Sequence, residues 1–494
     1  MIAYSAEFLK QLTIENNTQV FTDSRAVTPG GIFVALPAPS HRPDSTIRDG
    51  GEFIGMAIKA GASHIVCSPE WAVRLMDEYA DSPITLVPSE NPHALLGDLA
   101  AALHGTRYGP DVYAVTGTNG KTTVTYLLEH LFTAAGGSTG VLGTVNYRWT
   151  GHIESSPLTT PGALALHEYL HRMRDAGVSR AVLEASSHAL DQQRLTGIEC
   201  SGAVFTNLTQ DHLDYHTDME GYFAAKARLF LTVPHFTKAL AVNADDAFGV
   251  RLLRSIPHAV GFGLKQRPEW CAKNRFLHGE ILEHSINGLR LRMFFDSQVW
   301  EFASPLIGLY NASNLLAAQG MGLTLGLSPT QMASLTDFAG VPGRLERVAN
   351  ARNLHVFVDY AHTPDALANA LTAVRAAGFT SIIAVFGCGG DRDRTKRPLM
   401  GKAVTAHADV AVLTSDNPRT EDPLAIMADV LPGLKGVKSL IQEVDRKKAI
   451  KVALDLLKPT DALVIAGKGH EDYQIINGTK LHFSDQEIVR EFLC

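Results

Sequence analysis

The stretch DVYAVTGTNGKTTVTYLLEH, from Asp111 to His130, decides the fold of the chain's central part. Val112 to Val115 are typical of a short buried strand, and Val124 to Leu131 have the apolar spacing of a helix. Between them lies a glycine-rich turn, Thr116 to Thr123. Such a turn lets backbone N–H groups converge on an anion, and the following helix adds the partial positive charge of its N-terminus. The stretch therefore predicts a phosphate-binding loop.

Two side chains of this loop suit a nucleoside triphosphate bound with Mg²⁺. Lys121 is placed to reach the β- and γ-phosphates, and the Thr122 hydroxyl can ligate Mg²⁺. The usual pattern G-x-x-x-x-G-K-[ST] would put its first glycine at position 115, where this chain has Val115. The alternative is a chance glycine-rich turn. Because a strand precedes the loop and a helix follows it, we predict a nucleoside triphosphate site.

Length and composition indicate an ordinary multidomain globular protein. A chain of 494 residues is too long for one hydrophobic core, so two to four domains are expected. The net charge of −7 argues against a nucleic-acid partner, although a local basic pocket for a small anionic substrate stays possible. No apolar run reaches the roughly 18–20 residues of a membrane helix. The N-terminus, MIAYSAEFLK, has no export signal, so we expect a cytoplasmic protein.

The cysteines fit the same compartment. They are scattered without a C-x-x-C pair, which predicts free thiols rather than a disulfide or zinc framework. They are Cys67, Cys200, Cys271, Cys388 and Cys494.

Alternating strand and helix patterns predict an α/β protein of three domains, with boundaries at 1–106, 107–338 and 339–494. The first is a small α/β unit without a catalytic-looking cluster; it could be structural, oligomer-forming, or a recognition module for a sugar or nucleotide. The second should contain a mostly parallel sheet covered by helices on both faces. The third begins near the Pro342-Gly343 turn and has its own alternation.

The individual elements are predicted from the same periodicities. Strands are expected at 32–36, 63–67, 84–87, 181–184, 202–205, 239–242, 356–358, 382–386, 410–413 and 463–465. Further helices are expected at 53–60, 365–376 and 399–407. Residues 262–302 are strand-rich and should form a peripheral sheet.

Polar clusters follow the predicted strands, where open α/β sheets bind ligands. The central domain has three, at Glu184 to His188, Thr206-Asn207 and Asp211 to His216. The third domain has four, at Asp359 to His362, Gly387 to Arg392, Thr414 to Arg419 and Gly467 to Glu471. We expect these four to form one wall of a site facing the central domain.

Oxygen and nitrogen ligands for a metal ion recur at the edge of the central sheet. Thr122, Glu184 and His212 suit Mg²⁺, which takes few protein ligands besides phosphate oxygens. His212 and His216 could instead be a zinc pair, but no third ligand lies at a telling spacing. Alternatively, these histidines hydrogen-bond the loop backbone.

The third domain combines both signs of charge. Arg392, Arg394, Lys396 and Arg397 follow a Gly-Gly turn, and they are either a solvated charge run or a means of binding carboxylate or phosphate. Nearby Asp416, Arg419 and Glu471 would complete a pocket for a zwitterion such as an amino acid. No Ser/His/Asp arrangement is identifiable, and we treat the neighbours Ser187-His188 as loop residues. Catalysis should therefore work by positioning and charge neutralisation.

A set of motifs spread over most of the chain beyond residue 100 resembles the Mur ligases. The motifs are GTNGKTT (117–123), EASSHALDQQRL (184–195), TNLTQDHLDYH (206–216), AAKARLF (224–230), GLYNASN (308–314), PGRLE (342–346), DYAHTPDAL (359–367), GCGGDRDRTKRPLM (387–400) and GKGHEDYQ (467–474). The block DNPR, Asp416 to Arg419, resembles the branch that adds meso-diaminopimelate to UDP-N-acetylmuramoyl-L-alanyl-D-glutamate. Lysine-adding relatives typically lack that arginine.

The resemblance implies an architecture and a mechanism. A UDP-substrate-binding domain would precede a central P-loop ATPase and a C-terminal Rossmann-like domain that binds the incoming amino acid. ATP would phosphorylate the D-glutamate γ-carboxylate, and the amine of diaminopimelate would attack the acyl phosphate. Because that intermediate must be shielded from water, closure of domains over the site is expected.

The resemblance also implies roles for residues on the nucleotide side. Lys121, Glu184, His212 and Lys226 would be catalytic, and Thr122, Glu184, His212 and Lys226 would hold metal ions. Lys226 matches a lysine that CO₂ carbamylates, which turns a cation into a carboxylate; the alternative is a simple ion-pair lysine. ATP would contact Gly117, Thr118, Asn119, Gly120, Lys121, Thr122, Thr123, Asn311, Asn314, Arg344 and Asp359.

The remaining roles concern the other substrates. Ser24 and the loop around Asp49-Gly50 would bind the UDP part. The muramoyl-dipeptide would contact Thr159, Thr160, Ser186, Gln192 and Arg194. Diaminopimelate would contact Arg392, Asp416, Asn417, Pro418, Arg419, Gly467 and Glu471. Two departures affect these contacts: the stretch from Ala38 to Arg48 is longer than usual, and Leu158 stands where some relatives have Asn.

The expected protein is thus a cytoplasmic, monomeric, ATP- and Mg²⁺-dependent ligase of peptidoglycan synthesis, with roles in cell-wall biogenesis, cell shape and cell division. It would act on small molecules without a nucleic-acid or membrane partner. One alternative is the same ligase using L-lysine, which Arg419 argues against. A nucleotide-driven switch or transporter ATPase would turn over ATP without an amine. A folate polyglutamate ligase is disfavoured by DNPR and the N-terminal domain.

Overall fold

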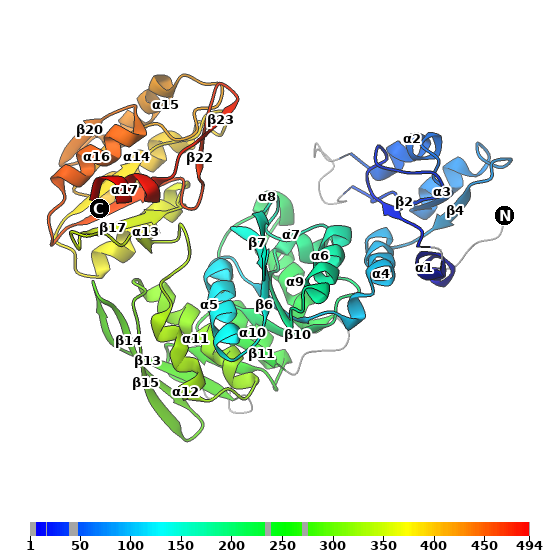
Figure 1. Ribbon diagram of the computed structural model, residues 1–494, viewed down its shortest axis with the longest axis horizontal. Helices are drawn as coiled ribbons and strands as arrows, with labels where there is room; N and C mark the ends of the chain where they lie inside the picture. The colour runs from blue at the N-terminus through cyan, green and yellow to red at the C-terminus, as the bar shows by residue number, and fades with distance from the viewer. Residues whose placement is uncertain (1–5, 16, 39–47, 233–238, 269–274, 494) are drawn as a thin grey trace. The chain divides into compact units, whose positions relative to one another are not determined.

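The computed structural model describes residues 6–15, 17–38, 48–232, 239–268 and 275–493 (Figure 1). The chain forms two compact units. The first comprises Met1–Gly263, Arg267–Phe276 and Ala317–Gln331, and the second comprises Leu264–Gln266, Leu277–Leu316 and Met332–Cys494. The three domain boundaries expected from the sequence stay a prediction.

The N-terminal part of the first unit is a small parallel sheet between helices. Its strands run in the order β1 (Val20–Phe21), β2 (Ile32–Val34), β3 (His64–Cys67) and β4 (Thr85–Pro88). The helices are α1 (Ala6–Glu15), α2 (Ile54–Lys59), α3 (Pro69–Met76) and α4 (Pro92–His104), with a 3₁₀ turn at Gly50–Phe53. Apolar side chains form a separate cluster on each face of the sheet. The strands β2, β3 and β4 and the helix α2 lie within two residues of their predicted positions, whereas β1 was not predicted.

A larger sheet forms the rest of the first unit. Its strand order is β12 (Val260–Gly263), β11 (Ala239–Asn243), β10 (Cys200–Phe205), β5 (Asp111–Thr116), β9 (Arg180–Glu184), β6 (Thr139–Leu142), β7 (Asn146–Trp149) and β8 (His152–Ser155). Pairing is parallel from β12 to β6 and antiparallel from β6 to β8. Five consecutive residues of β5 are buried, as expected for a strand covered on both faces. The mostly parallel sheet predicted here is confirmed.

Helices connect these strands. They are α5 (Lys121–Ala134), α6 (Ala163–Asp175), α7 (Ser187–Asp191), α8 (Leu213–His216), α9 (Met219–Leu231) and α10 (Ala247–Ser255), with a 3₁₀ turn at Thr106–Tyr108. The interpretation of Ser187 and His188 as loop residues was wrong, because α7 begins at Ser187. The Ser186 hydroxyl caps this helix by accepting from the Ala189 N–H at 3.2 Å.

The second unit begins with an antiparallel meander. β13 (Phe276–Ser285), β14 (Gly288–Phe295) and β15 (Gln298–Ser304) pair in chain order, which confirms the strand-rich stretch predicted at 262–302. α11 (Leu309–Thr324), α12 (Pro329–Met332) and a 3₁₀ turn at Ala333–Asp337 follow, and α11 runs from the second unit into the first.

A second parallel sheet organises the C-terminal part. Its order is β16 (Glu346–Arg347), β17 (His355–Asp359), β21 (Ala462–Ala466), β18 (Ile382–Phe386), β19 (Val410–Leu413) and β20 (Ser439–Gln442). Only β16 is antiparallel to its neighbour. The C-terminal part also contains five helices, which are α13 (Pro364–Ala376), α14 (Lys396–His407), α15 (Pro423–Val430), α16 (Arg446–Leu456) and α17 (Asp485–Leu493). It further contains a 3₁₀ turn at Leu431–Leu434 and a hairpin of β22 (Tyr473–Ile476) and β23 (Thr479–His482). Apolar clusters lie on both sheet faces.

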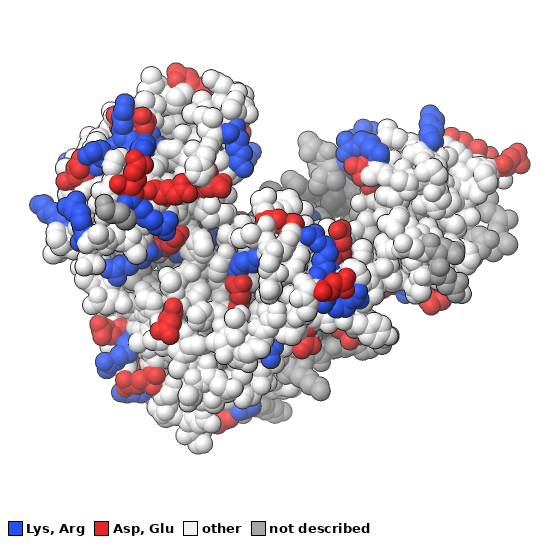
Figure 2. Space-filling view, viewed as in Figure 1, with Lys and Arg blue, Asp and Glu red and all other residues white. Residues whose placement is uncertain are grey.

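The surface of both units is charged and mixed in sign. Basic and acidic side chains are interspersed on the face shown in Figure 2. Among the surface ion pairs of the second unit are Lys447 with Glu491 and Lys451 with Asp455. Among the helices that the structure describes, none is long and apolar enough to span a bilayer.

Candidate active site

The turn between β5 and α5 has room for glycine alone at its first position. Gly117 has φ +147°, and a Cβ there would lie 1.9 Å from the Thr206 hydroxyl. Gly120 has φ +86° and precedes the first residue of α5 without a side chain to cap the helix. The backbone conformation therefore supports the predicted phosphate-binding loop, because glycine tolerates positive φ and close approach.

The loop is held against the segment that follows β10. The Thr118 N–H donates to the Asn207 carbonyl at 2.9 Å, and the Asn119 N–H donates to Asn207 Oδ1 at 2.9 Å. Thr206 Oγ1 donates to the Asn119 carbonyl at 2.5 Å. Lys121 Nζ donates to the carbonyls of Gly117 and Thr118, both at 2.9 Å. The loop is thus organised by its own protein contacts, with its lysine folded over it.

A buried carboxylate lies beside the start of α5. Glu184, at the end of β9, is 1% exposed. Its Oε2 accepts from Thr122 Oγ1 at 3.1 Å and from Thr144 Oγ1 at 2.9 Å, and its Oε1 accepts from the Thr144 N–H at 2.8 Å. The structure therefore brings together two of the predicted Mg²⁺ ligands, Thr122 and Glu184.

Lys226, on α9, is buried against the same loop. Its side chain is 1% exposed and Nζ donates to the Gly117 carbonyl at 2.8 Å. Burial, together with the nearby Lys121 ammonium, lowers the pKa of Lys226 well below its usual range. Within the described ranges no carboxylate forms an ion pair with Lys226, so the simple ion-pair alternative finds no support.

His212 lies in an aromatic cluster. Its Nε2 is 3.4 Å from Asp211 Oδ2, and its ring centroid is 4.9 Å from that of His188. Tyr215, His216 and Tyr222 complete the cluster. In the part of the chain that the structure describes, no group of three His, Cys, Asp or Glu side chains is arranged to hold a metal ion.

The five residues predicted to hold the dipeptide form one network next to Glu184. Thr159 Oγ1 is 3.2 Å from Thr144 Oγ1, and Thr160 Oγ1 donates to the Glu184 carbonyl at 2.6 Å. The other contacts are Ser186 N–H to Thr160 Oγ1 at 3.0 Å, Arg194 Nη1 to the Thr160 carbonyl at 2.7 Å, and Arg194 Nη2 to Gln192 Oε1 at 2.7 Å.

The residues assigned to UDP lie in the N-terminal part of the first unit. Ser24 is 5% exposed and its hydroxyl contacts Met56 Sδ at 3.2 Å. Asp49 Oδ1 accepts from the Gly51 N–H and from Trp71 Nε1, both at 2.8 Å, and Oδ2 accepts from the Ala38 N–H at 3.1 Å. Asp49 thus organises the turn. Residues 39–47 of the loop predicted to be unusually long lie outside the described residues.

Four further residues that were predicted to contact ATP belong to the second unit. Asn311 and Asn314 are adjacent on α11, with Asn314 Nδ2 donating to Asn311 Oδ1 at 3.0 Å. Asp359, at the end of β17, accepts from the Leu345 N–H at 2.7 Å and from the Ala361 N–H at 2.8 Å. Burial raises the pKa of Asp359, while the Arg344 guanidinium opposes that shift.

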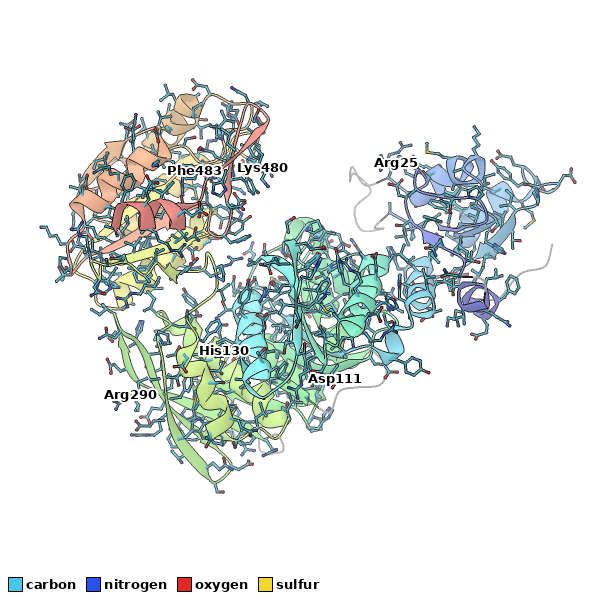
Figure 3. The ribbon with its side chains drawn as sticks, viewed as in Figure 1. Arg25, Asp111, His130, Arg290, Lys480 and Phe483 are labelled. Atoms are coloured by element: carbon cyan, nitrogen blue, oxygen red, sulfur yellow. The ribbon has the colours of Figure 1, made fainter. Side chains whose placement is uncertain are left out.

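An acidic and amide cluster lies where β19 and β21 end. Lys468 Nζ, fully buried, is 3.2 Å from Asp416 Oδ1 and donates to Asn417 Oδ1 at 3.1 Å. Asn417 Nδ2 donates to Glu471 Oε2 at 3.0 Å. Burial, with Asp416 nearby, raises the pKa of Glu471. The Lys468 ammonium lies 5.9 Å from the ring of Phe483, which Figure 3 labels beside Lys480.

Two guanidinium groups border this cluster. Arg419 adopts φ +52° and its Nη1 donates to the Gly390 carbonyl at 2.7 Å; a Cβ on Gly389 would lie 2.9 Å from this Nη1 and 3.8 Å from Arg392 Cγ. Across the described ranges, neither Arg392 nor Arg419 forms an ion pair. Arg397, by contrast, is 1% exposed and pairs with Glu421 at 2.7 Å and Asp429 at 2.9 Å.

The basic stretch from 392 to 397 therefore divides in two. Arg394 also pairs with Glu421 and Asp429, so Arg394 and Arg397 are structural. Arg392 and Arg419 keep guanidinium groups without a carboxylate partner among the described residues. Pro418 and Gly467, also predicted here, shape the backbone: a Cβ on Gly390 would lie 1.9 Å from the Pro418 carbonyl oxygen, and Gly467 has φ +115°.

Comparison with known proteins decides the family. Residues 115–322 match the Mur ligase middle domain, and residues 343–469 match the Mur ligase, glutamate ligase domain. This chain belongs to the Mur ligase family. The predicted family, the α/β fold class and the enzyme class are confirmed, and this Mur ligase is an ATP-dependent enzyme that forms amide bonds.

This Mur ligase is similar in sequence or structure to three known ligases. A UDP-N-acetylmuramoyl-L-alanyl-D-glutamate–2,6-diaminopimelate ligase from Lawsonia intracellularis is 50% identical over 494 residues, covering 100% of this chain and 99% of the relative. A solved structure of a ligase with the same name is 34% identical with a TM-score of 0.68, covering 96% and 94%. The MurF ligase of Thermotoga maritima in complex with ADP shares the fold, with 16% identity, a TM-score of 0.54 and coverage of 96% and 97%.

Sequence reasoning missed Thr144 and Gly143 in this Mur ligase. Both follow the apolar stretch 139–142, which forms β6, and the strand-end rule could have found them. That stretch was not recognised as a strand. A lone threonine after a glycine also lacks the charged side chains that marked most of the other clusters.

Proposed function

We propose that this chain joins meso-diaminopimelate to the D-glutamate γ-carboxylate of UDP-N-acetylmuramoyl-L-alanyl-D-glutamate, converting ATP to ADP and phosphate, in peptidoglycan precursor synthesis. The relatives with 50% and 34% identity are both named as ligases of UDP-N-acetylmuramoyl-L-alanyl-D-glutamate and 2,6-diaminopimelate. One observation supports the amino acid in particular: two guanidinium groups without carboxylate partners lie beside the acidic cluster of Asp416 and Glu471. We also propose a cytoplasmic monomer that contributes to cell-wall biogenesis, cell shape and cell division.

The amino-acid side of the proposal follows from charge. A planar guanidinium binds a carboxylate through two parallel hydrogen bonds, so Arg392 and Arg419 suit the distal carboxylate of diaminopimelate. Asp416 and Glu471 suit its ammonium group, because Lys468 neutralises only one of these two carboxylates. Asn417 holds Glu471 in place. L-lysine has no distal carboxylate and would leave both guanidinium groups unpartnered.

The nucleotide side rests on the loop from Gly117 to Thr123. Lys121 and the backbone N–H groups at the start of α5 would hold the phosphates. Thr122 and Glu184 are hard oxygen donors in contact with each other, which fits Mg²⁺, and His212 would serve a second ion. Bound Mg²⁺ would neutralise phosphate charge. In the second unit, Asn311, Asn314, Arg344 and Asp359 would contact the rest of ATP.

Lys226 would carry the carbamate. Because burial lowers the pKa of Lys226, its amine can be present in the neutral form that attacks CO₂. An N–C bond forms as one C–O π bond opens onto oxygen, the nitrogen loses a proton, and the neutral amine becomes a carbamate anion. The resulting carboxylate would lie beside Gly117 and could bind a metal ion.

The chemistry proceeds in two displacements. The dipeptide, held by Thr159, Thr160, Ser186, Gln192 and Arg194, presents its γ-carboxylate, whose oxygen attacks the γ-phosphorus of ATP; the bond to the bridging oxygen breaks and ADP leaves. The neutral amine of diaminopimelate then attacks the acyl carbon, the C–O bond to phosphate breaks, and the nitrogen loses a proton. The residues contribute orientation and charge neutralisation, because the sequence shows no recognisable Ser/His/Asp arrangement for covalent catalysis.

A phosphate-release assay with ATP, Mg²⁺, the UDP-muramoyl-dipeptide and either meso-diaminopimelate or L-lysine tests the proposal. We expect release only with meso-diaminopimelate. Arg419→Ala should raise the KM for this amino acid about 10- to 100-fold, the equivalent of one charged hydrogen-bond pair. Arg394→Ala, an exposed residue of the same basic stretch, is the matched control and should leave that KM unchanged.

Two outcomes would contradict the proposal. Equal turnover of L-lysine by the wild type, or an unchanged KM in Arg419→Ala, would remove the amino-acid assignment. Phosphate release without any amine would instead support a nucleotide-driven switch.

A further inference from the structure

We propose that Thr144 is a positioning residue that fixes the carboxylate of Glu184 and couples it to Thr159. This inference rests on the proposed function, in which Glu184 binds Mg²⁺ and Thr159 binds the muramoyl-dipeptide. Thr144 would act through these two side chains rather than by touching a substrate.

The first observation is that Thr144 holds both oxygens of one carboxylate. Its N–H donates to Glu184 Oε1 at 2.8 Å and its hydroxyl donates to Oε2 at 2.9 Å. The strand pairing makes this possible: Leu142 of β6 lies beside Leu183 of β9, so the residues that follow meet Glu184. Two donors from one residue fix the rotation of the carboxylate group, and Oε2 is then presented to Thr122 at 3.1 Å.

The second observation is that Gly143 leaves no space for a side chain. A Cβ at this position would lie 2.5 Å from Glu184 Oε1 and 3.1 Å from its Cγ and Cδ. The glycine does not have a positive φ, so the close approach, not the backbone conformation, accounts for it. The turn after β6 is therefore shaped around the carboxylate.

The third observation concerns the direction of the hydroxyl protons. Thr144 Oγ1 has one proton and gives it to Glu184, so at its 3.2 Å contact with Thr159 Oγ1 it must accept. The Thr159 proton then points at Thr144, and the lone pairs of Thr159 remain for donors on a ligand. A series of hydrogen bonds from Thr159 through Thr144 to Glu184 therefore connects the side chain proposed to bind the dipeptide with the side chain proposed to bind Mg²⁺.

Thr144→Val keeps the shape of the side chain and removes only its hydroxyl. Groups that orient metal ligands typically change metal affinity 10- to 100-fold when removed. We expect the Mg²⁺ concentration for half-maximal activity to rise about tenfold. The KM for the UDP-muramoyl-dipeptide should rise as well, because Thr159 loses its fixed proton direction. The KM for meso-diaminopimelate should not change.

The experiment compares the wild type with Thr144→Val, Thr144→Ser and Thr150→Val. Thr144→Ser retains the hydroxyl and should restore both values. Thr150→Val removes an exposed hydroxyl that contacts Ser138 in the same region and should change neither. Titrating Mg²⁺ into protein with a fluorescent ATP analogue measures the metal requirement without turnover, and thermal unfolding reports on the fold.

The results separate the inference from the proposed function. Wild-type protein that fails to use diaminopimelate contradicts the function, whereas the Mg²⁺ titration still tests Thr144. Unchanged Mg²⁺ and dipeptide values in Thr144→Val, or Thr144→Ser behaving like it, overturn the inference. If the valine variant does not fold, Thr144→Ala decides: it removes the same hydroxyl with a smaller side chain and should raise both the Mg²⁺ requirement and the dipeptide KM. Unchanged values in a folded Thr144→Ala would overturn the inference.

Discussion

Hydrogen-bond partners that can only donate determine how buried polar side chains of this ligase are oriented. Asn417 illustrates this. Its Oδ1 accepts from the Lys468 ammonium and from the Ile475 N–H, neither of which can accept in return. The amide nitrogen must therefore face Glu471. Such contacts fix the acceptor and donor pattern of a pocket before any ligand binds.

His167, on α6, gives a prediction about pH at this scale. It is fully buried; its Nε2 contacts the Thr196 carbonyl at 2.9 Å and its Nδ1 the Thr106 hydroxyl at 2.7 Å. Burial, with a smaller effect of His104, lowers its pKa to about 4. Between that value and the usual 6.5 the unfolded chain binds the extra proton, so the folded state loses stability as the pH falls through this window.

We expect His167 to account for up to about 3 kcal/mol of stability lost between pH 6.5 and 4. His167→Gln keeps a donor for the Thr196 carbonyl and should flatten the dependence of the unfolding free energy on pH over this range. Chemical denaturation from pH 7.5 to 4.5 measures it. His258→Gln, at an exposed position, should retain the wild-type slope; an equal slope in both variants would contradict the assignment.

For single residues, the sequence predicted the chemical role of a side chain better than it predicted which other side chains it contacts. The pairing of Thr122 with Glu184 could be anticipated, because both residues follow parallel strands of one sheet. The strand-end position of Thr144 could also have been anticipated, but its contact with Glu184 could not, since that contact depends on β6 lying beside β9, a strand that is not its neighbour in the chain. The division of the basic stretch also required the structure, because Arg397 and Arg392 have the same charge and differ only in burial and partners.

In the segment formed by β5, the phosphate-binding loop and α5, the backbone of the loop tolerates substitution least. Glycine at position 117 is required by both φ and space, whereas Gly136, just after α5, has φ +85° and open space where a Cβ would lie, with no other atom within 4 Å. Replacing glycine by alanine at position 117 and at position 136 therefore separates the effect of steric crowding from the effect of backbone strain.

We expect Gly117→Ala to abolish measurable binding of a fluorescent ATP analogue, because its Cβ would displace Thr206 and the loop with it. Gly136→Ala should cost about 1 kcal/mol of stability and leave nucleotide binding intact. Titration of both variants with the analogue, together with their melting temperatures, checks this. Retained binding in Gly117→Ala would mean that the loop is less tightly held than its contacts indicate.

Helices and strands with a clear spacing of apolar residues were predicted from the sequence, whereas elements whose position depends on their surroundings in the fold were not. Most strands of the parallel sheets are apolar runs bounded by polar residues, which explains why their positions were found. β1, β6 and β20 are short or only partly apolar, and they were not found. The short helix α7 was missed because five residues carry too little periodicity; its start is set by the Ser186 cap. Helix α14 begins at Lys396 instead of Leu399, since its charged first turn resembles a loop.

The whole molecule consists of two compact units, and their stabilities can be tested separately. The second unit contains a fully buried ion pair between Arg446 of α16 and Asp485 of α17, with the Arg446 guanidinium also donating to the Ala466 carbonyl at 3.0 Å. Removing one partner of a buried pair leaves the other charge without compensation, which costs about 3–5 kcal/mol. An exposed pair of the same helices, Lys447 with Glu491, offers the comparison, since such pairs contribute about 0–1 kcal/mol.

Asp485→Ala should therefore lower the melting temperature of the second unit by roughly 10 °C. Glu491→Ala, on the same helix, should lower it by no more than a few degrees. Differential scanning calorimetry resolves the two units if they unfold independently. The transition of the first unit, identified by its downward shift in Gly136→Ala, should not move in either variant. Equal effects of the two substitutions would show that the buried pair is not a main support of the second unit. A joint fall of both transitions would show instead that the two units unfold as one cooperative body.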